Sequence, residues 1–198
     1  MKKNLKNKLL NKKENGWKNI DTREKEAIYS FCNGYMKFLN TSKTEREAVC
    51  SAKQIAESNG FRDISTFDTL NPGDKVYFIN REKSMYLAII GTEKLENGLQ
   101  IVGAHIDSPR LDLKPNPLYE DGGFAYFKTH YYGGIKKYQW TAIPLSIHGV
   151  IVKPNGTKVN VNIGEDESDP IFTITDLLPH LAQDQMSKKL KDGIDGED

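Results

Sequence analysis

Two segments near the start of the chain have apolar residues at the spacing of an α-helix. In residues 22–39 they recur every three or four positions, which places them on one helical face. Asp21 and Glu24 have the spacing of a capping box at the start of this segment. Thr44 and Glu47 have the same spacing at the start of residues 45–58, and Gly60 follows where helices often end in glycine. We therefore expect two consecutive helices.

Beyond these segments the apolar pattern changes to that of strands. Residues 75–79 and 85–90 flank a polar stretch and predict a β-hairpin. Residues 99–104 form another apolar run, for which we also expect a strand, and this run ends in the polar sequence HIDSPR. Further aromatic and β-branched runs predict strands over 124–132, 142–153 and 158–163, followed by a short helical stretch over 175–190.

Composition narrows the range of functions. Lys and Arg total 28 and Asp and Glu total 27, so the formal net charge is +1 and gives no general attraction to nucleic acid or an anionic membrane. The longest uninterrupted apolar run, residues 87–90, is far shorter than the roughly 20 residues of a membrane-spanning helix. We therefore expect a soluble protein with neither a nucleic-acid nor a membrane partner.

The cysteines and the first residues add two expectations. Cys32 and Cys50 fall in the predicted helices, where we expect small buried hydrophobic residues rather than nucleophiles or a disulfide. Residues 1–19 are rich in Lys and Asn and lack the continuous apolar region of a signal peptide. We expect them to form a solvated, partly helical lead-in and the protein to reside in a reducing compartment.

The sequence His105-Ile106-Asp107 is the first candidate for chemistry. Imidazole is a common protein ligand of zinc, and it is oriented when its second ring nitrogen donates to a carboxylate. In extended chain the side chains of positions i and i+2 point to the same side, so Asp107 can lie beside His105. The same pattern suits a partly buried histidine with a capping aspartate, and both interpretations stay open on these residues alone.

Three longer blocks resemble one family of enzymes. Residues 102–115, VGAHIDSPRLDLKP, closely resemble the metal-binding segment of the aspartyl aminopeptidase family of zinc metallopeptidases. Residues 132–152, with YGGI, a tryptophan and LSIHGVIV, are similar to that family's next block in order and spacing. Residues 178–182, LPHLA, match a third block. The resemblance covers nearly all of the chain after residue 21.

The resemblance implies a cytoplasmic exopeptidase that removes N-terminal residues, preferably acidic ones, from peptide substrates with two co-catalytic zinc ions. A zinc-activated water attacks the scissile carbonyl in that family, and a glutamate acts as general base. Carried over by position, His105 would be a zinc ligand and Asp107 the catalytic carboxylate that orients and tunes the site. His180 would contact substrate from a neighbouring subunit, whereas His130 and His148 are expected to be structural.

The resemblance also implies the fold. We expect an α/β protein in which residues 1–113 are the N-terminal part of a mixed-sheet α/β catalytic domain. Residues 114–198 would be part of a β-rich dimerisation and assembly domain, through which the protein would form homo-oligomers.

The chain departs from the family in length, because members are more than twice as long and carry further aspartate, glutamate and histidine ligands later in the sequence. One histidine and one carboxylate cannot hold two zinc ions, since even a single catalytic zinc usually has three protein ligands. We therefore expect an N-terminal portion of such an enzyme, inactive by itself. Two alternatives remain: a non-catalytic assembly or scaffold protein derived from a peptidase, and a different binuclear metal hydrolase such as an amidase or deacetylase.

Overall fold

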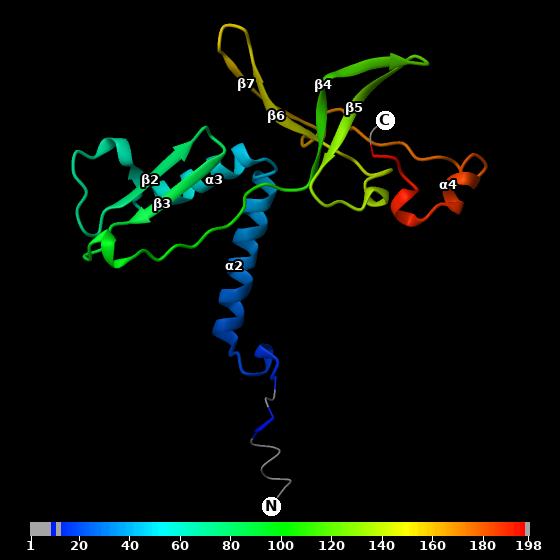
Figure 1. Cartoon of the computed structure of the whole chain (residues 1–198). Coiled ribbons are helices and arrows are strands. Elements are labelled where there is room, and N and C mark those ends of the chain that lie inside the picture. The colour runs from blue at the N-terminus through cyan, green and yellow to red at the C-terminus, as the bar shows by residue number, and fades with distance from the viewer. Residues whose placement is uncertain (1–8, 11–12, 197–198) are drawn as a thin grey trace, which may run out of the picture. The chain divides into compact units, whose positions relative to one another are not determined.

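A computed structural model describes residues 9–10 and 13–196 of the chain (Figure 1). The chain divides into two compact units, residues 1–41 and residues 42–198. Much of the expected lead-in, residues 1–8 and 11–12, lies outside the described residues, and in the described remainder Gly16–Lys18 forms one 3-10 turn. No helix among the described residues combines the length and apolar character needed to cross a membrane.

The first unit contains α2 (Thr22–Thr41), which confirms the first predicted helix. Its capping box is formed: the Asp21 carboxylate accepts from the Glu24 backbone N–H at 2.7 Å, and Glu24 accepts from that of Asp21 at 3.1 Å. No residue of α2 is buried, and Cys32 is exposed. The expectation of a buried Cys32 is wrong because the described residues of this unit hold no second long element to pack on the helix.

The second unit begins with α3 (Glu45–Ser58), whose bounds match the second predicted helix. The Thr44–Glu47 capping box is present at its start, and beyond its end Gly60 has a φ of +84°, the left-handed conformation that glycine adopts without steric cost. The side of α3 that carries Ala48, Val49 and Ala56 is buried. Cys50 is exposed, again contrary to expectation, because it projects from a different side of the helix.

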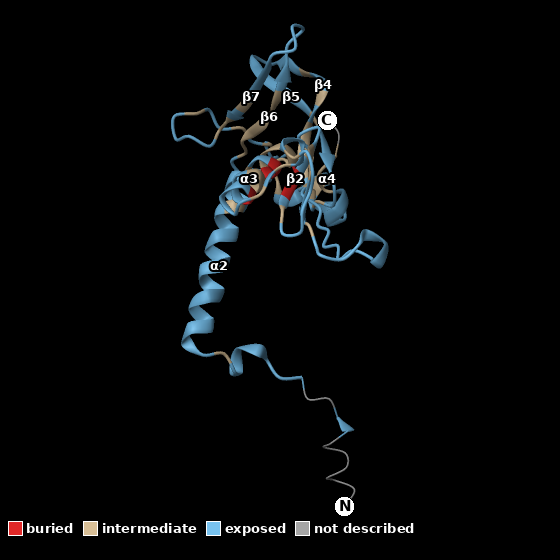
Figure 2. Ribbon diagram, turned by 90° about the vertical axis from the view of Figure 1, so that its left-hand side faces the viewer, coloured by how far each residue is buried: buried red, intermediate tan, exposed pale blue. Residues whose placement is uncertain are grey.

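A three-stranded mixed sheet follows α3. It comprises β1 (Arg62–Asp63), β2 (Lys75–Asn80) and β3 (Ser84–Ile89), with β1 parallel and β3 antiparallel to β2. Val76 and Tyr77 of β2 are only 3% and 5% exposed, and Figure 2 shows most of the buried residues in α3 and β2. The mixed sheet confirms the α/β class and the predicted hairpin.

The turn between β2 and β3 is unusual because Arg81 and Glu82, neither of them glycine, have positive φ values of 51° and 61°. Such a conformation carries a steric cost and needs support from its surroundings. The Glu82 carboxylate accepts from Arg46 of α3 and from Lys158, a residue distant in sequence. These two ion pairs hold the turn in place.

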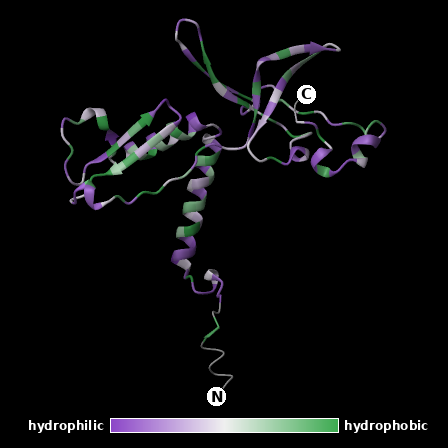
Figure 3. Cartoon of the chain, in the orientation of Figure 1, coloured by the Kyte–Doolittle hydropathy of each residue, from purple (hydrophilic) through white to green (hydrophobic). Residues whose placement is uncertain are grey.

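The strand predicted over residues 99–104 is not formed. After the largely polar residues 91–98 that follow β3, hydrophobic residues return in this irregular segment (Figure 3), where Ile101 is 81% and Val102 99% exposed. An apolar run becomes a buried strand only when neighbouring strands take up its backbone hydrogen bonds, and the described residues place none beside it. The polar residues from His105 onward therefore follow an irregular segment rather than a strand.

The next two strands form a long hairpin, β4 (Arg110–Asp121) with β5 (Phe124–Tyr132). The bounds of β5 are those predicted. Strand β4 went unpredicted because Pro115 and Pro117 argue against a regular strand, and the register shifts between Leu113 and Leu118 to accommodate them. The hairpin turns through two consecutive glycines with positive φ.

The last hairpin joins β6 (Ile147–Val152) to β7 (Lys158–Ile163), and β7 has the predicted bounds. The prediction of a strand over residues 142–153 was too long, because Pro144 and a positive φ at Ala142 interrupt the ladder before β6. The helical stretch expected over 175–190 shrinks to α4 (Gln183–Ser187).

Candidate functional site

His105 lies in the irregular segment just before β4, with its side chain 83% exposed. Its Nδ1 is 2.9 Å from the backbone oxygen of Asp107 and 3.2 Å from the Oδ1 atom of the same residue. Both oxygens are acceptors, so in the neutral ring Nδ1 carries the proton and donates. The lone pair is then on Nε2, the nitrogen that faces away from Asp107 and is able to bind a metal ion.

Asp107 is held on its other side by Tyr132, the last residue of β5. The Tyr132 hydroxyl donates to Oδ2 of Asp107 at 3.0 Å, so each carboxylate oxygen has a partner. This hydrogen bond is the main reason why the pKa of Asp107 lies below its usual value, and its own backbone N–H and His105 contribute further. The pKa of Tyr132 is raised for the same reason, because the hydroxyl proton is shared with a carboxylate.

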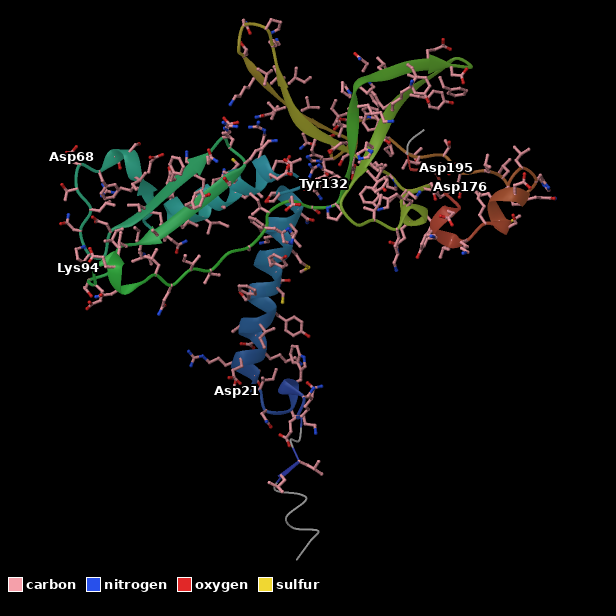
Figure 4. The ribbon with its side chains drawn as sticks, viewed as in Figure 1. Asp21, Asp68, Lys94, Tyr132, Asp176 and Asp195 are labelled. Atoms are coloured by element: carbon pink, nitrogen blue, oxygen red, sulfur yellow. The ribbon has the colours of Figure 1, made fainter. Side chains whose placement is uncertain are left out.

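Arg110, the first residue of β4, contacts Tyr132. Its guanidinium lies 4.1 Å from the centre of the Tyr132 ring, a cation–π contact. The same group forms ion pairs with Asp112 at 2.7 Å and with Glu45 of α3 at 3.0 Å. Tyr132 was not predicted as a site residue, although it begins the second block that resembles the family. Figure 4 labels Tyr132 near the point where the irregular segment meets the β4–β5 hairpin.

His180 is not brought into this cluster. It is exposed, in a turn before α4, and it forms no hydrogen bond or ion pair with the described residues. A leucine and a proline precede it, and proline disfavours helix in the residue before it, which explains why the predicted helix does not extend over this position. The contact of His180 with substrate in a neighbouring subunit stays a prediction.

His148 of β6 has a different environment from His105, since its side chain is only 9% exposed. Its Nδ1 lies 2.8 Å from Glu47 of α3, and its Nε2 lies 3.1 Å from Glu165 and 3.0 Å from the Ser146 hydroxyl. Both ring nitrogens are therefore engaged, which leaves neither free for a metal ion.

The donor set matches part of a zinc site. His105 presents a free nitrogen and Asp107 a carboxylate that orients the ring, the pairing commonly found around zinc-binding histidines. Within residues 9–10 and 13–196, however, no three His, Cys, Asp or Glu side chains converge to hold a metal ion. A catalytic zinc needs about three protein ligands, so the described residues supply a fitting part of a centre and not a complete one.

Comparison with known proteins reveals extensive similarity. The sequence model of the family described as aminopeptidase I zinc metalloprotease (M18) matches residues 38–196. A probable M18 family aminopeptidase 1 from Clostridium acetobutylicum is 50% identical over 196 residues, which are 97% of this chain and 42% of that protein. A protein with the same description from Thermotoga maritima is 49% identical over 177 residues, 88% of this chain and 38% of the relative.

Solved structures agree with the sequence comparison. The crystal structure of the M18 aminopeptidase from Thermotoga maritima superimposes with a TM-score of 0.86 at 44% identity, over 95% of this chain and 40% of that one. Aminopeptidase I from Borrelia burgdorferi gives a TM-score of 0.80 at 46% identity, over 84% of this chain and 41% of the other. The chain thus spans about two fifths of the length of the relatives it matches.

Proposed function

This chain belongs to the aminopeptidase I zinc metalloprotease (M18) family, and from that membership we propose that it provides the first part of a zinc-dependent aminopeptidase. The proposed substrates are peptides, from which the complete enzyme removes N-terminal residues, preferably acidic ones. The proposed location is the cytoplasm. The observation that carries the proposal is the paired geometry of His105 and Asp107, which leaves Nε2 of the histidine free.

The two residues have distinct roles in the proposed site. His105 would bind zinc through Nε2, and Asp107 would keep the imidazole in the required tautomer and orientation. Two zinc ions in the complete enzyme would supply a water of lowered pKa and polarise the scissile carbonyl. The remaining ligands and the general base have to come from polypeptide other than the described residues, which hold no group of three donors. His180 is proposed to contact the substrate of a neighbouring subunit.

The domain division follows the same proposal. Residues 1–113 would belong to the catalytic domain, and residues 114–198 to a β-rich domain through which subunits associate. Exposed aromatic residues of the β4–β5 hairpin support an association surface: Phe124 is 67% exposed, and Tyr119 stacks on Tyr126 with ring centres 5.3 Å apart.

The 198-residue chain is proposed to be inactive alone and active when complemented. The test adds zinc and the part of the Clostridium acetobutylicum relative that the match leaves uncovered, and follows release of N-terminal Asp, Glu, Leu and Ala from short peptides. The proposal requires that only the mixture hydrolyses the peptides, and that N-terminal Asp and Glu are released faster than Leu and Ala. Hydrolysis should be lost when the chain carries His105→Ala and retained when it carries the control substitution His130→Ala.

Two other outcomes would overturn parts of this proposal. Hydrolysis by the chain alone would contradict its inactivity and require further metal ligands within these 198 residues. A stable mixed complex that binds no zinc and cleaves no peptide would favour the assembly or scaffold function, for which the exposed aromatic residues of the β4–β5 hairpin are the supporting observation.

A further inference from the structure

Tyr132 is connected to His105 through a continuous hydrogen-bonded path. The Tyr132 hydroxyl donates to Oδ2 of Asp107 at 3.0 Å, and Oδ1 of the same carboxylate faces Nδ1 of His105 at 3.2 Å. A carboxylate attached by one side-chain bond can rotate, but partners on both oxygens restrict it to one plane. The orientation of the acceptor offered to His105 therefore depends on Tyr132.

The position of Tyr132 is itself determined by the β4–β5 hairpin. In the strand register Tyr132 pairs with Arg110, and Arg110 follows Asp107 by only three residues. The next residue, Gly133, has a φ of +77°, and a Cβ placed there would lie 3.5 Å from Pro109, so the chain leaves β5 in close contact with the segment that carries Asp107. The hydroxyl thus reaches Asp107 from a strand rather than from a loop.

The ring of Tyr132 is also supported on its face. The Arg110 guanidinium lies 4.1 Å from the ring centre and is anchored by the carboxylates of Asp112 and Glu45 at 2.7 Å and 3.0 Å. This side chain is 28% exposed, so its ion pairs are partly shielded from solvent. Rigid support of this kind is what a residue needs in order to orient another group.

We propose that Tyr132 is a positioning residue: through Asp107 it holds His105 in the Nδ1–H tautomer and leaves Nε2 free for a metal ion. Among the described residues the exposed imidazole, 83% accessible, has one further partner at Nδ1, the backbone oxygen of Asp107 at 2.9 Å, and this oxygen belongs to the same residue that the Tyr132 hydroxyl holds. Only the last step, metal binding at Nε2, rests on the proposed aminopeptidase function. The effect on the tautomer is independent of any metal.

The test measures the tautomer of His105 directly in the full chain. Long-range proton–nitrogen correlation spectra of the ¹⁵N-histidine-labelled protein, recorded about two pH units above the ordinary histidine pKa of about 6.5, distinguish Nδ1–H from Nε2–H. The variant His105→Gln assigns the signals. We expect wild-type His105 to be Nδ1–H and Tyr132→Phe to give a mixture of both tautomers.

The matched control is Tyr131→Phe. Tyr131 and Tyr132 are adjacent and equally exposed at 39%, but the ring of Tyr131 stacks on His130 and its hydroxyl does not reach Asp107. We expect Tyr131→Phe to leave His105 as in the wild type. Tyr132→Phe should fold, because Oδ2 of the 39% exposed Asp107 can turn to water, and unchanged His148 signals would verify this.

A second variant tests the path itself. Asp107→Asn removes the charged acceptor, so we expect it to produce the same tautomer mixture, with no further change in the double variant Tyr132→Phe/Asp107→Asn. The inference is overturned if Tyr132→Phe leaves His105 entirely Nδ1–H, or if Tyr131→Phe has an equal effect. Additive changes in the double variant would also contradict a single path through Asp107.

A zinc titration separates this inference from the proposed function. Added Zn²⁺ should shift the Nε2 signal of wild-type His105, with an affinity about tenfold lower in Tyr132→Phe, as for other partners of zinc-binding histidines. If zinc leaves His105 unchanged while the tautomer depends on Tyr132, the positioning role stands and the metal function fails. If zinc binds through His105 equally well in both proteins and the tautomer of His105 is also unchanged in Tyr132→Phe, the positioning role fails instead.

Discussion

His148 of β6 and Glu47 of α3, 101 positions apart in the sequence, are joined by a 2.8 Å hydrogen bond from Nδ1 to Oε1. The same carboxylate accepts from the backbone N–H and the hydroxyl of Thr44 through its other oxygen, at 2.9 Å and 3.2 Å. One glutamate therefore caps α3 and ties it to a distant hairpin. Two different substitutions can separate these contributions.

Replacing Glu47 by Gln keeps a capping-box side chain but removes the charged acceptor for His148. We expect Glu47→Gln to lower the free energy of unfolding by about 1 kcal/mol and Glu47→Ala by about 2 kcal/mol, since alanine also loses the cap. Urea unfolding followed by circular dichroism measures both. The control Glu167→Gln changes an exposed residue without a hydrogen bond to the described residues, and an equal loss there would refute the coupling.

Glu165 should make the free energy of unfolding depend on pH in the acidic range. The hydrogen bond from Ser146, at 3.0 Å, is the main cause of its lowered pKa, followed by that from His148, at 3.1 Å. A carboxyl group with a lowered pKa in the folded state stabilises the protein above its ordinary pKa, and this contribution disappears as the pH falls through the folded-state value.

We therefore expect Glu165→Gln to be less stable than wild type at pH 7, with the difference shrinking as the pH falls below about 4.5. Unfolding free energies at several pH values between about 3 and 7 provide the measurement. A difference that stays constant over this range would show that the loss at neutral pH does not arise from ionisation of Glu165.

For Tyr77 we expect the opposite pH dependence: its contribution to the free energy of unfolding should be lost as the pH rises into the alkaline range. Its hydroxyl donates to Glu57 of α3 at 2.8 Å, and this bond raises the pKa of Tyr77 to about 12. Because the folded state holds the proton more tightly, the contribution is complete below about pH 10 and is lost as the pH rises towards 12.

The stability advantage of wild type over Tyr77→Phe should therefore narrow between about pH 10 and 12. Near-ultraviolet absorbance of tyrosinate should in addition show that the variant has lost a late-titrating group. Tyr86→Phe is the control, because Tyr86 is 63% exposed and lies on the neighbouring strand. If both variants lose the same titration step, the bond to Glu57 does not control the pKa.

Substitutions at two valines can test whether an apolar segment contributes to stability when its side chains are exposed. Val102 is 99% exposed, whereas Val76 of β2 is 3% exposed. We expect Val102→Ala to change the free energy of unfolding by less than about 0.5 kcal/mol and Val76→Ala to lower it by about 2 kcal/mol. Thermal unfolding of the two variants measures this, and similar losses would mean that residues 99–104 are packed after all.

Local features were predictable because the groups that create them are close in sequence. The helix starts at Thr22 and Glu45 depend on capping residues within three positions, and the β2–β3 hairpin depends on one short turn. The family resemblance singled out His105 and Asp107 as candidate site residues for a similar reason, since the motif is contiguous. For these parts, the order of residue types was sufficient.

The burial of a side chain and its hydrogen-bond partners, by contrast, depend on which other segments of the chain lie around it. Cys32, Cys50 and residues 99–104 have the composition of buried segments, yet no neighbouring element covers them among the described residues. The contact between Tyr132 and Asp107 spans 25 positions and requires the β4–β5 register. The order of residue types was enough to predict the two long helices and most strands, because these depend on local spacing, and the contiguous motif pointed to His105 as the proposed zinc ligand. Which groups meet became clear only from the folded chain, because such contacts depend on the packing of distant segments.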